Sequence, residues 1–203
     1  MNDGRLDYFD AMYAASADPY GLRERWYEQR KRAVLLAALP HARYGSAFEP
    51  GCGAGELSIE LATRCDRVLA SDFSDAALQS ARARARAGGV SNLRFAAHVL
   101  PHEWPGDAGP FDLIVVSEVG YFLETSAMVE LARRCSESLS TDGVLATCNW
   151  RYAFDRRVIS TDAVHEAFAN TGLHRIVRHV EADFLLEVWC RDPRSVAQRD
   201  GLF

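Results

Sequence analysis

The chain has 203 residues, of which 48% are apolar and 25% charged, and its net charge is −5. This composition is typical of a soluble globular protein with one core, and it argues against a nucleic-acid backbone as the main partner. The arginine-rich stretch 80–89 (SARARARAGG) alternates with alanine in a helical pattern, so it is interpreted as a solvated helix surface. No stretch resembles a signal peptide or a membrane span.

The five cysteines are scattered and form no CxxC pair. Such a pattern indicates a reducing, cytoplasmic environment rather than a disulfide framework, and it argues against a zinc site. We therefore expect no metal.

The expected elements fall into two parts. Residues 6–12 and 22–39 have helical patterns, separated by the turn residues of 17–21 and closed by Pro40. From residue 46 onward strands alternate with helices. The expected strands are 47–49, 67–71, 93–97, 111–116, 144–149, 174–180 and 184–190, and the expected helices are 56–64, 74–86, 127–139 and 161–171.

Strands separated by helices predict right-handed βαβ units and a parallel sheet covered on both faces. The last two strands are joined too tightly for a crossover helix, so they form a hairpin that adds an antiparallel strand. The prediction is one α/β domain, Rossmann-like and doubly wound, over residues 1–203, with a helical cap (1–45) and a core (46–203).

The stretch 48–56 (FEPGCGAGE) links the first core strand to a helix. Its glycines, Gly51, Gly53 and Gly55, are spaced GxGxG rather than the GxGxxG of dinucleotide-binding loops, and no Lys-Ser or Lys-Thr follows them. Glu49 precedes the loop, where a carboxylate would repel a pyrophosphate but suits a cationic amine. The alternative is a plain strand-to-helix turn.

Asp72 ends the second core strand, 17 residues after Gly55. A carboxylate there can accept two hydrogen bonds from a ribose diol, although an acid flanking a helix is common by itself. A ribose and an ammonium group without phosphate describe S-adenosylmethionine.

With these motifs the sequence resembles the class I S-adenosylmethionine-dependent methyltransferases, in particular the branch of nodulation protein S, which N-methylates a deacetylated glucosamine end. The similar stretches are 18–40 (DPYGLRERWYEQRKRAVLLAALP), 48–74, 102–123 (HEWPGDAGPFDLIVVSEVGYFL) and 162–168 (DAVHEAF). The resemblance implies a seven-stranded sheet with an antiparallel last strand, and N-terminal helices that cover the cofactor.

The resemblance also implies which residues contact the cofactor. Trp26, Tyr27 and Arg30 would touch the cofactor, with Arg30 pairing with the methionine carboxylate. The alternatives are ordinary helix packing for Trp26 and Tyr27 and a solvated helix face for Arg30. Val99 stands where the family places an acid for adenine, so backbone groups or His98 would take over that role. The expected cofactor-binding residues are Tyr27, Arg30, Glu49, Gly51, Gly53, Gly55, Asp72, Phe73, Val99, Leu100 and Ser117.

Methyl transfer to an amine benefits from a carboxylate or histidine beside the nucleophile. Glu118 follows the fourth core strand and is the first candidate, with helix capping as its alternative. Asp162 and His165 share a helix face and are further candidates, although His165 also fits a structural role. Tyr121 would line the acceptor pocket, and the aromatic residues for stacking on a sugar are Trp150, Tyr152 and Phe154. Packing in the core or in a loop is the alternative for each of these residues.

The sequence thus predicts a cytoplasmic methyltransferase that converts S-adenosyl-L-methionine to S-adenosyl-L-homocysteine. Its expected acceptor is an amine of an amino sugar or related small molecule or oligosaccharide, without nucleic acid or membrane. We expect a monomer or weak homodimer. The alternatives are a small-metabolite O-methyltransferase, an NAD(P)-dependent oxidoreductase, and a binding module with a degenerate methyltransferase fold.

Overall fold

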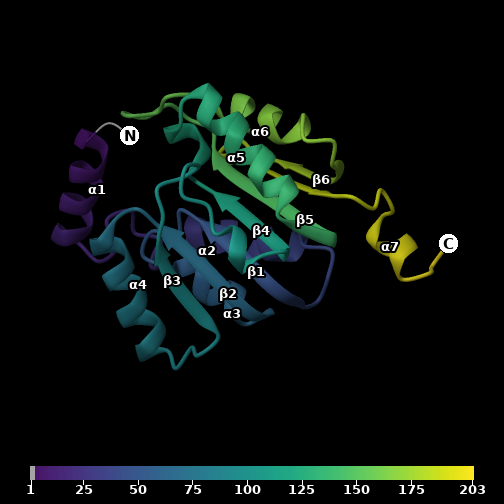
Figure 1. Ribbon diagram of the computed structural model, residues 1–203, viewed down its shortest axis with the longest axis horizontal. Helices are drawn as coiled ribbons and strands as arrows, with labels where there is room; N and C mark the ends of the chain where they lie inside the picture. Colours follow the sequence, from purple (N-terminus) through teal and green to yellow (C-terminus); the bar gives the residue numbers. More distant parts are fainter. Residues whose placement is uncertain (1–2) are drawn as a thin grey trace.

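The computed structural model describes residues 3–203, built around a seven-stranded sheet of order β3-β2-β1-β4-β5-β7-β6 (Figure 1). Strands β1 to β5 pair in parallel, and β7 runs antiparallel to both β5 and β6. This confirms the Rossmann-like sheet with an antiparallel last strand. The strands are β1 (Tyr44–Pro50), β2 (Cys65–Asp72), β3 (Leu93–Ala97), β4 (Phe111–Ser117), β5 (Leu139–Trp150), β6 (His174–Val180) and β7 (Phe184–Cys190).

Helices cover both faces of the sheet. On one face of the sheet, Leu35, Leu61 and Val68 belong to one buried apolar cluster. On the other face, Met128 and Phe168 belong to a second. β4 is therefore almost continuously apolar (FDLIVVS), as expected of a strand covered on both sides. The helices are α1 (Asp3–Ala15), α2 (Trp26–Ala38), α3 (Glu56–Ala62), α4 (Asp75–Ala87), α5 (Thr125–Glu137), α6 (Thr161–Ala169) and α7 (Val196–Arg199), with short 3-10 turns at Gly106–Ala108 and Gly120–Phe122.

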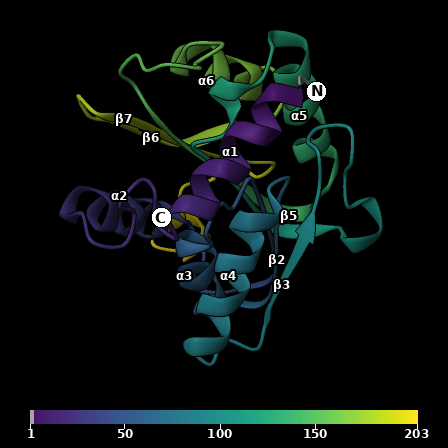
Figure 2. The same ribbon diagram turned by 90° about the vertical axis from the view of Figure 1, so that its left-hand side faces the viewer.

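The helix α1 lies beside α4 (Figure 2) and packs against the loops at one end of the sheet. The ring of Phe9 meets the rings of Phe73 and Phe122 edge-on, at centroid distances of 5.6 and 5.2 Å. Asp10 accepts hydrogen bonds from the Ser74 hydroxyl and the Ala76 N–H. An apolar contact and a helix-capping contact together attach α1 to the core.

The helix α2 begins later than the expected residue 22. Asp18 accepts hydrogen bonds from the N–H groups of Leu22 and Arg23, at 2.7 and 3.0 Å, and Gly21 has a positive φ of 66°. These bonds stabilise a turn over these residues, so the helix begins only at Trp26.

The strand order reverses between β1 and β4, which are neighbours at the centre of the sheet. In open α/β sheets the loops beyond the carboxyl ends of the strands separate at this point and leave a crevice for a ligand. The fold therefore places the glycine loop after β1 and the residues after β4 on the two sides of one crevice.

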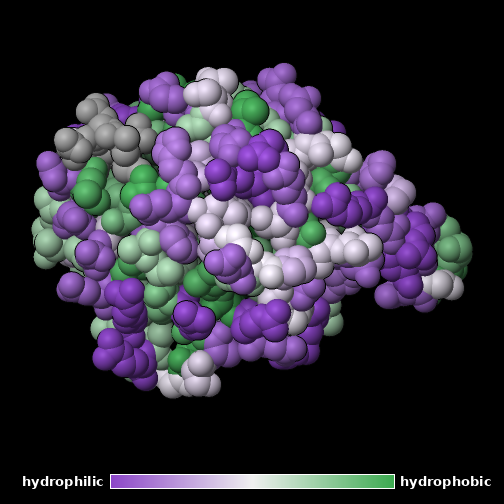
Figure 3. Space-filling view, viewed as in Figure 1, coloured by the Kyte–Doolittle hydropathy of each residue, from purple (hydrophilic) through white to green (hydrophobic). Residues whose placement is uncertain are grey.

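The C-terminal end projects from the sheet with α7 (Figure 1). Polar residues cover much of the face in Figure 3, and the projecting end has an apolar tip, where Leu202 and Phe203 are exposed. No helix in residues 3–203 is long and apolar enough to cross a membrane.

Candidate functional site

A cavity of about 590 Å³ opens at the carboxyl ends of the central strands. Its volume is in the range of cavities that hold small molecules and cofactors. It extends from the glycine loop to the ends of β4 and β5, and α1 and α2 contribute to its wall. The predicted site residues that line it are Tyr27, Glu49, Gly51, Gly53, Asp72, Phe73, Leu100, Ser117 and Glu118.

The glycine loop approaches its neighbours too closely for side chains. Gly51, Gly53 and Gly55 have φ values of 73°, 52° and 77°, a region that favours glycine. A Cβ on Gly51 would lie 2.1 Å from Val119 Cγ2, and one on Gly53 would lie 2.5 Å from the Tyr13 hydroxyl. Gly55 has the same conformation but does not line the cavity. The loop is thus a bare backbone cradle.

Asp72 fixes this cradle from the end of β2. Its two carboxylate oxygens accept hydrogen bonds from the N–H groups of Gly53 and Ser74, at 2.9 and 3.0 Å. Burial raises the pKa of the carboxyl, while these backbone hydrogen bonds oppose the rise. Each oxygen keeps a second acceptor site for a ligand hydroxyl, as a ribose diol requires. Phe73, the next residue, lines the cavity beside it.

Glu49 lies beneath the loop and is 4% exposed. The hydroxyl of Ser58 donates a hydrogen bond to its carboxyl. Burial raises the pKa of Glu49 to about 8, so the carboxyl is mostly protonated at neutral pH. A cationic ligand group beside it would favour the ionised form.

The loop after β3 provides apolar contact at the far end of the cradle. Leu100 and His98 line the cavity, whereas Val99 does not. The Val99 N–H donates to the Glu103 carboxylate at 2.7 Å, so Glu103 already uses one backbone group that was expected to reach adenine. His98 Nδ1 is buried without a partner among residues 3–203.

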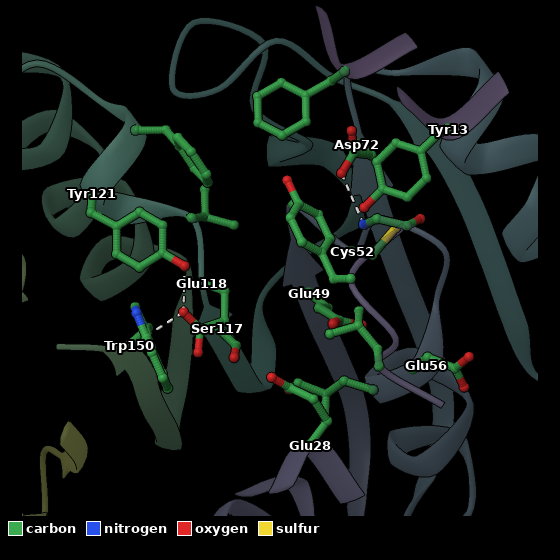
Figure 4. Close-up of a pocket in the computed structure, with 18 of the residues that line it drawn as sticks. Tyr13, Glu28, Glu49, Cys52, Glu56, Asp72, Ser117, Glu118, Tyr121 and Trp150 are labelled. Atoms are coloured by element: carbon green, nitrogen blue, oxygen red, sulfur yellow. Dashed lines mark hydrogen bonds between the residues drawn. The ribbon is translucent and has the colours of Figure 1, made fainter. Parts of the chain in front are cut away.

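Glu118 lies at the opposite side of the cavity, directly after β4. Its φ of 61° is unfavourable for a residue with a side chain, at a cost of about 1–2 kcal/mol. The carboxylate accepts hydrogen bonds from the Trp150 N–H at 3.0 Å and from the Tyr121 hydroxyl (Figure 4). It also accepts one from Lys31 Nζ at 2.6 Å. These contacts keep the backbone in this conformation and hold the carboxylate in the wall.

Lys31 connects Glu118 to a second carboxylate. Its ammonium lies 2.9 Å from Glu28 Oε2 and 5.2 Å from the centre of the Tyr27 ring, and its side chain is 6% exposed. Burial lowers the pKa of Lys31, but the charges of Glu118 and Glu28 raise it by more, so the ammonium stays charged. We call Glu28, Lys31 and Glu118 the charged triad; its formal charge is −1.

Three other predicted residues lie outside the cavity lining. Arg30 forms two hydrogen bonds of 2.8 Å with the Glu181 carboxylate. His165 is buried, with Nδ1 2.8 Å from Glu187 Oε2. Asp162 borders a separate small hollow with Arg151 and Tyr152. The structure does not bring these three together with Glu118, and their predicted roles stay predictions.

The sequence reasoning overlooked Glu28, Lys31 and Tyr13. Glu28 and Lys31 are three residues apart in WYEQRK, a spacing that puts both on one face of a helix. That spacing was the available signal, but charged helix residues are usually solvated. Tyr13 gave no signal, because α1 packs over the cavity only through tertiary contacts.

These features fit S-adenosylmethionine. Gly51 and Gly53 present bare backbone to the cavity, and the Asp72 carboxylate beside them has acceptor sites left for ribose hydroxyls. Glu49 lines the same cavity, where its carboxyl would face the methionine ammonium. The charged triad lines the same cavity as the glycine loop.

Comparisons with known proteins agree with this fit. Residues 47–143 match the methyltransferase domain family. A putative methyltransferase from Pseudomonas syringae is 44% identical; the alignment covers 81% of this chain and 99% of that one, with a TM-score of 0.71. The N-methyltransferase NodS from Bradyrhizobium japonicum, crystallised with S-adenosyl-L-homocysteine, is 26% identical over 95% of this chain and 100% of that one, with a TM-score of 0.82.

A curated relative is the ribosomal RNA small subunit methyltransferase C of Salmonella typhimurium. It is 30% identical over 154 residues, which are 72% of this chain and 44% of that protein. The chain thus spans less than half the length of this relative. All of these proteins are methyltransferases, and the cradle and Asp72 fit the cofactor of that class. The chain belongs to the class I S-adenosylmethionine-dependent methyltransferases.

Proposed function

We propose that the protein methylates an amine nitrogen of a small molecule or oligosaccharide, with an amino sugar as the acceptor class. The observation that carries this proposal is the charged triad. An ammonium already lies there between two carboxylates and beside an aromatic ring, at 2.6 and 2.9 Å from the oxygens. A site that holds one ammonium and keeps a formal charge of −1 has the chemistry to bind a second.

The chain's own residues would position the two reactants. When bound, the cofactor would supply a sulfonium methyl group. The acceptor's ammonium would first lose a proton to a carboxylate of the charged triad, and the nitrogen lone pair would then take the methyl group as the C–S bond breaks and S-adenosyl-L-homocysteine remains. Gly51, Gly53 and Asp72 would hold its nucleoside part, and Glu49 its ammonium. The charged triad would hold the acceptor nitrogen in line, and such positioning is the main help that this reaction needs.

Aromatic residues beside the triad support a sugar acceptor. Trp150 lines the cavity, and its main-chain N–H donates a hydrogen bond to Glu118. Tyr152, whose ring centre lies 5.0 Å from that of Trp150, is half exposed and borders the separate hollow. Phe154 lines the cavity next to Tyr121. Such rings can stack on the apolar faces of a sugar while carboxylates bind its amine.

The name of NodS supports N-methylation, while the ribosomal RNA relatives suggest an RNA acceptor. The net charge of −5 and the acidic triad do not favour a phosphate backbone. N-methylation of a small cationic acceptor therefore agrees with more of the observations.

Methyl transfer from labelled S-adenosylmethionine tests this proposal. The acceptors are glucosamine, a glucosamine tetramer, the N-acetylated tetramer, ethanolamine and a ribosomal RNA fragment. We expect label on the free amines, with mass spectrometry locating it on nitrogen. Label on oxygen or RNA alone, or on no amine, would contradict N-methylation.

A further inference from the structure

We propose that Glu28 is the residue that binds the acceptor's ammonium, with Lys31 as the residue that positions it. This inference rests on the proposed function, because it concerns the acceptor of the same cavity. Glu28 lies in the first turn of α2 and lines the cavity. The sequence had assigned this task to Glu118, which lies on the other side of Lys31.

The two carboxylates differ in how many hydrogen bonds they can still accept. A carboxylate has about four acceptor sites. Glu118 uses three of them, for Lys31, Tyr121 and the Trp150 N–H. Glu28 has one donor among residues 3–203, the Lys31 ammonium at Oε2. Glu28 therefore has three free sites, including all of Oε1, and Glu118 has one.

Lys31 determines where these free sites are. Its ammonium is held by Glu118 at 2.6 Å and by Glu28 at 2.9 Å, so the two carboxylates keep a fixed separation. In Figure 4 the side chains of Glu28 and Glu118 border the same part of the cavity, near Ser117 at the end of β4. An ammonium bound to Glu28 Oε1 would thus be near the strand end where the methyl group is delivered.

The charge of the triad favours this task. Lys31 neutralises the equivalent of one carboxylate, and because Glu118 is already bonded to three protein donors, the uncompensated charge lies mainly on Glu28. The Glu28 side chain is 14% exposed, which leaves it accessible from the cavity but poorly solvated. A cation that binds there meets a partly desolvated carboxylate, where electrostatic attraction exceeds that at the surface.

The test measures binding without turnover. The protein is saturated with S-adenosyl-L-homocysteine, and the glucosamine tetramer, glucosamine and ethanolamine are titrated into it by calorimetry at pH 6.5, where the amines are protonated. Glu28→Gln keeps the shape and removes the charge. We expect it to weaken amine binding at least tenfold, since hydrogen bonds to charged groups are strong, and to leave the affinity for S-adenosyl-L-homocysteine unchanged.

The matched control is Glu24→Gln, which removes a carboxylate from an exposed position outside the cavity lining and should change neither affinity. Amine binding by Glu28→Gln at the wild-type affinity would overturn the role of Glu28, while wild-type N-methylation would still support the proposed function. If the wild type neither binds nor methylates any of the amines, both proposals fail.

A second variant covers the case in which Glu28→Gln misfolds. Glu28→Asp keeps the charge but moves it back by one methylene. Weaker amine binding with unchanged affinity for S-adenosyl-L-homocysteine would support the proposal, and two unchanged affinities would overturn it.

Discussion

The cofactor end and the acceptor end of the cavity are built in different ways. The cofactor end consists mainly of backbone, namely the positive-φ glycines after β1, which the Asp72 carboxylate holds through the Gly53 N–H. The acceptor end consists of side chains from separate elements, with Lys31 of α2 between Glu28 and Glu118 and Tyr121 beyond them. One end therefore depends on local chain geometry and the other on tertiary packing.

This difference has consequences for how each end can change. A backbone cradle tolerates almost no substitution at its glycines, but it makes no distinction among acceptors. A network of side chains can be altered one residue at a time, so acceptor specificity can change while cofactor binding persists. Variants at the two ends should accordingly fail in different ways.

The largest effect is expected at the cofactor end, for Gly51→Ala. The new Cβ would lie 2.1 Å from Val119 Cγ2, on a residue with φ of 73°. Overpacking and the left-handed backbone together should cost about 4 kcal/mol of unfolding free energy and abolish binding of S-adenosyl-L-homocysteine. Urea denaturation and calorimetry measure the two quantities.

Gly172→Ala is the matched control, because Gly172 has φ of 81° but nothing within 4 Å of its Cβ position. It should show the backbone cost alone, about 1–2 kcal/mol, with cofactor binding intact. Equal losses of stability for the two variants would mean that the close approach to Val119 is unimportant.

The next largest effect is expected at the acceptor end, for Lys31→Met. Methionine has a similar length but leaves two carboxylates facing each other without the cation, which should cost about 3 kcal/mol of unfolding free energy. Arg30→Met provides the comparison on the same helix, because its pair with Glu181 is 42% exposed on the arginine side. That loss should be much smaller, because solvent screens an exposed ion pair. Similar melting temperatures for the two variants would show that the triad is not a stabilising network.

The same contrast explains what the sequence could predict. The alternation of strands and helices along the sequence predicted a doubly wound parallel sheet with a final hairpin. This was possible because hydrophobic periodicity is a local signal. The glycine spacing, Glu49 and Asp72 were also local sequence signals, and all of these residues line or border the cradle. Arg30 and Lys31 are adjacent in WYEQRK, and no local rule tells which of them turns toward the cavity. The structure directs Lys31 inward and Arg30 to Glu181, because the packing of α2 on the sheet sets its rotation.

A pH-dependent effect is expected for Glu49. Its pKa is about 8 in the folded protein against an ordinary 4.5, so the carboxyl is protonated when folded and ionised when unfolded across this window. Unfolding releases a proton there, so stability is fully present below pH 4.5 and is lost as the pH rises toward 8. Between pH 5.5 and 7.5 the wild type should lose about 2 kcal/mol of unfolding free energy through this group.

Glu49→Gln removes the titrating group and should flatten this part of the stability curve, measured by urea denaturation at several pH values. Glu124→Gln, outside the cavity lining, should retain the wild-type slope. The same slope in Glu49→Gln and in the wild type would assign the pH dependence to other groups.

The smallest effect is expected for Tyr13→Phe, which tests whether a side chain of α1 contributes to the cofactor end. The Tyr13 hydroxyl faces Gly53 across the cradle, and burial together with the charge of Asp72 raises its pKa, so it remains a neutral donor. A neutral hydrogen bond to the ligand is worth about 1 kcal/mol, so the affinity for S-adenosyl-L-homocysteine should fall about fivefold. Tyr44→Phe, which removes a buried hydroxyl bonded to the His41 N–H outside the cavity lining, should leave that affinity unchanged. If Tyr13→Phe binds as tightly as the wild type, then α1 covers the cradle without contacting the ligand, and backbone geometry with Asp72 accounts for cofactor binding at this end.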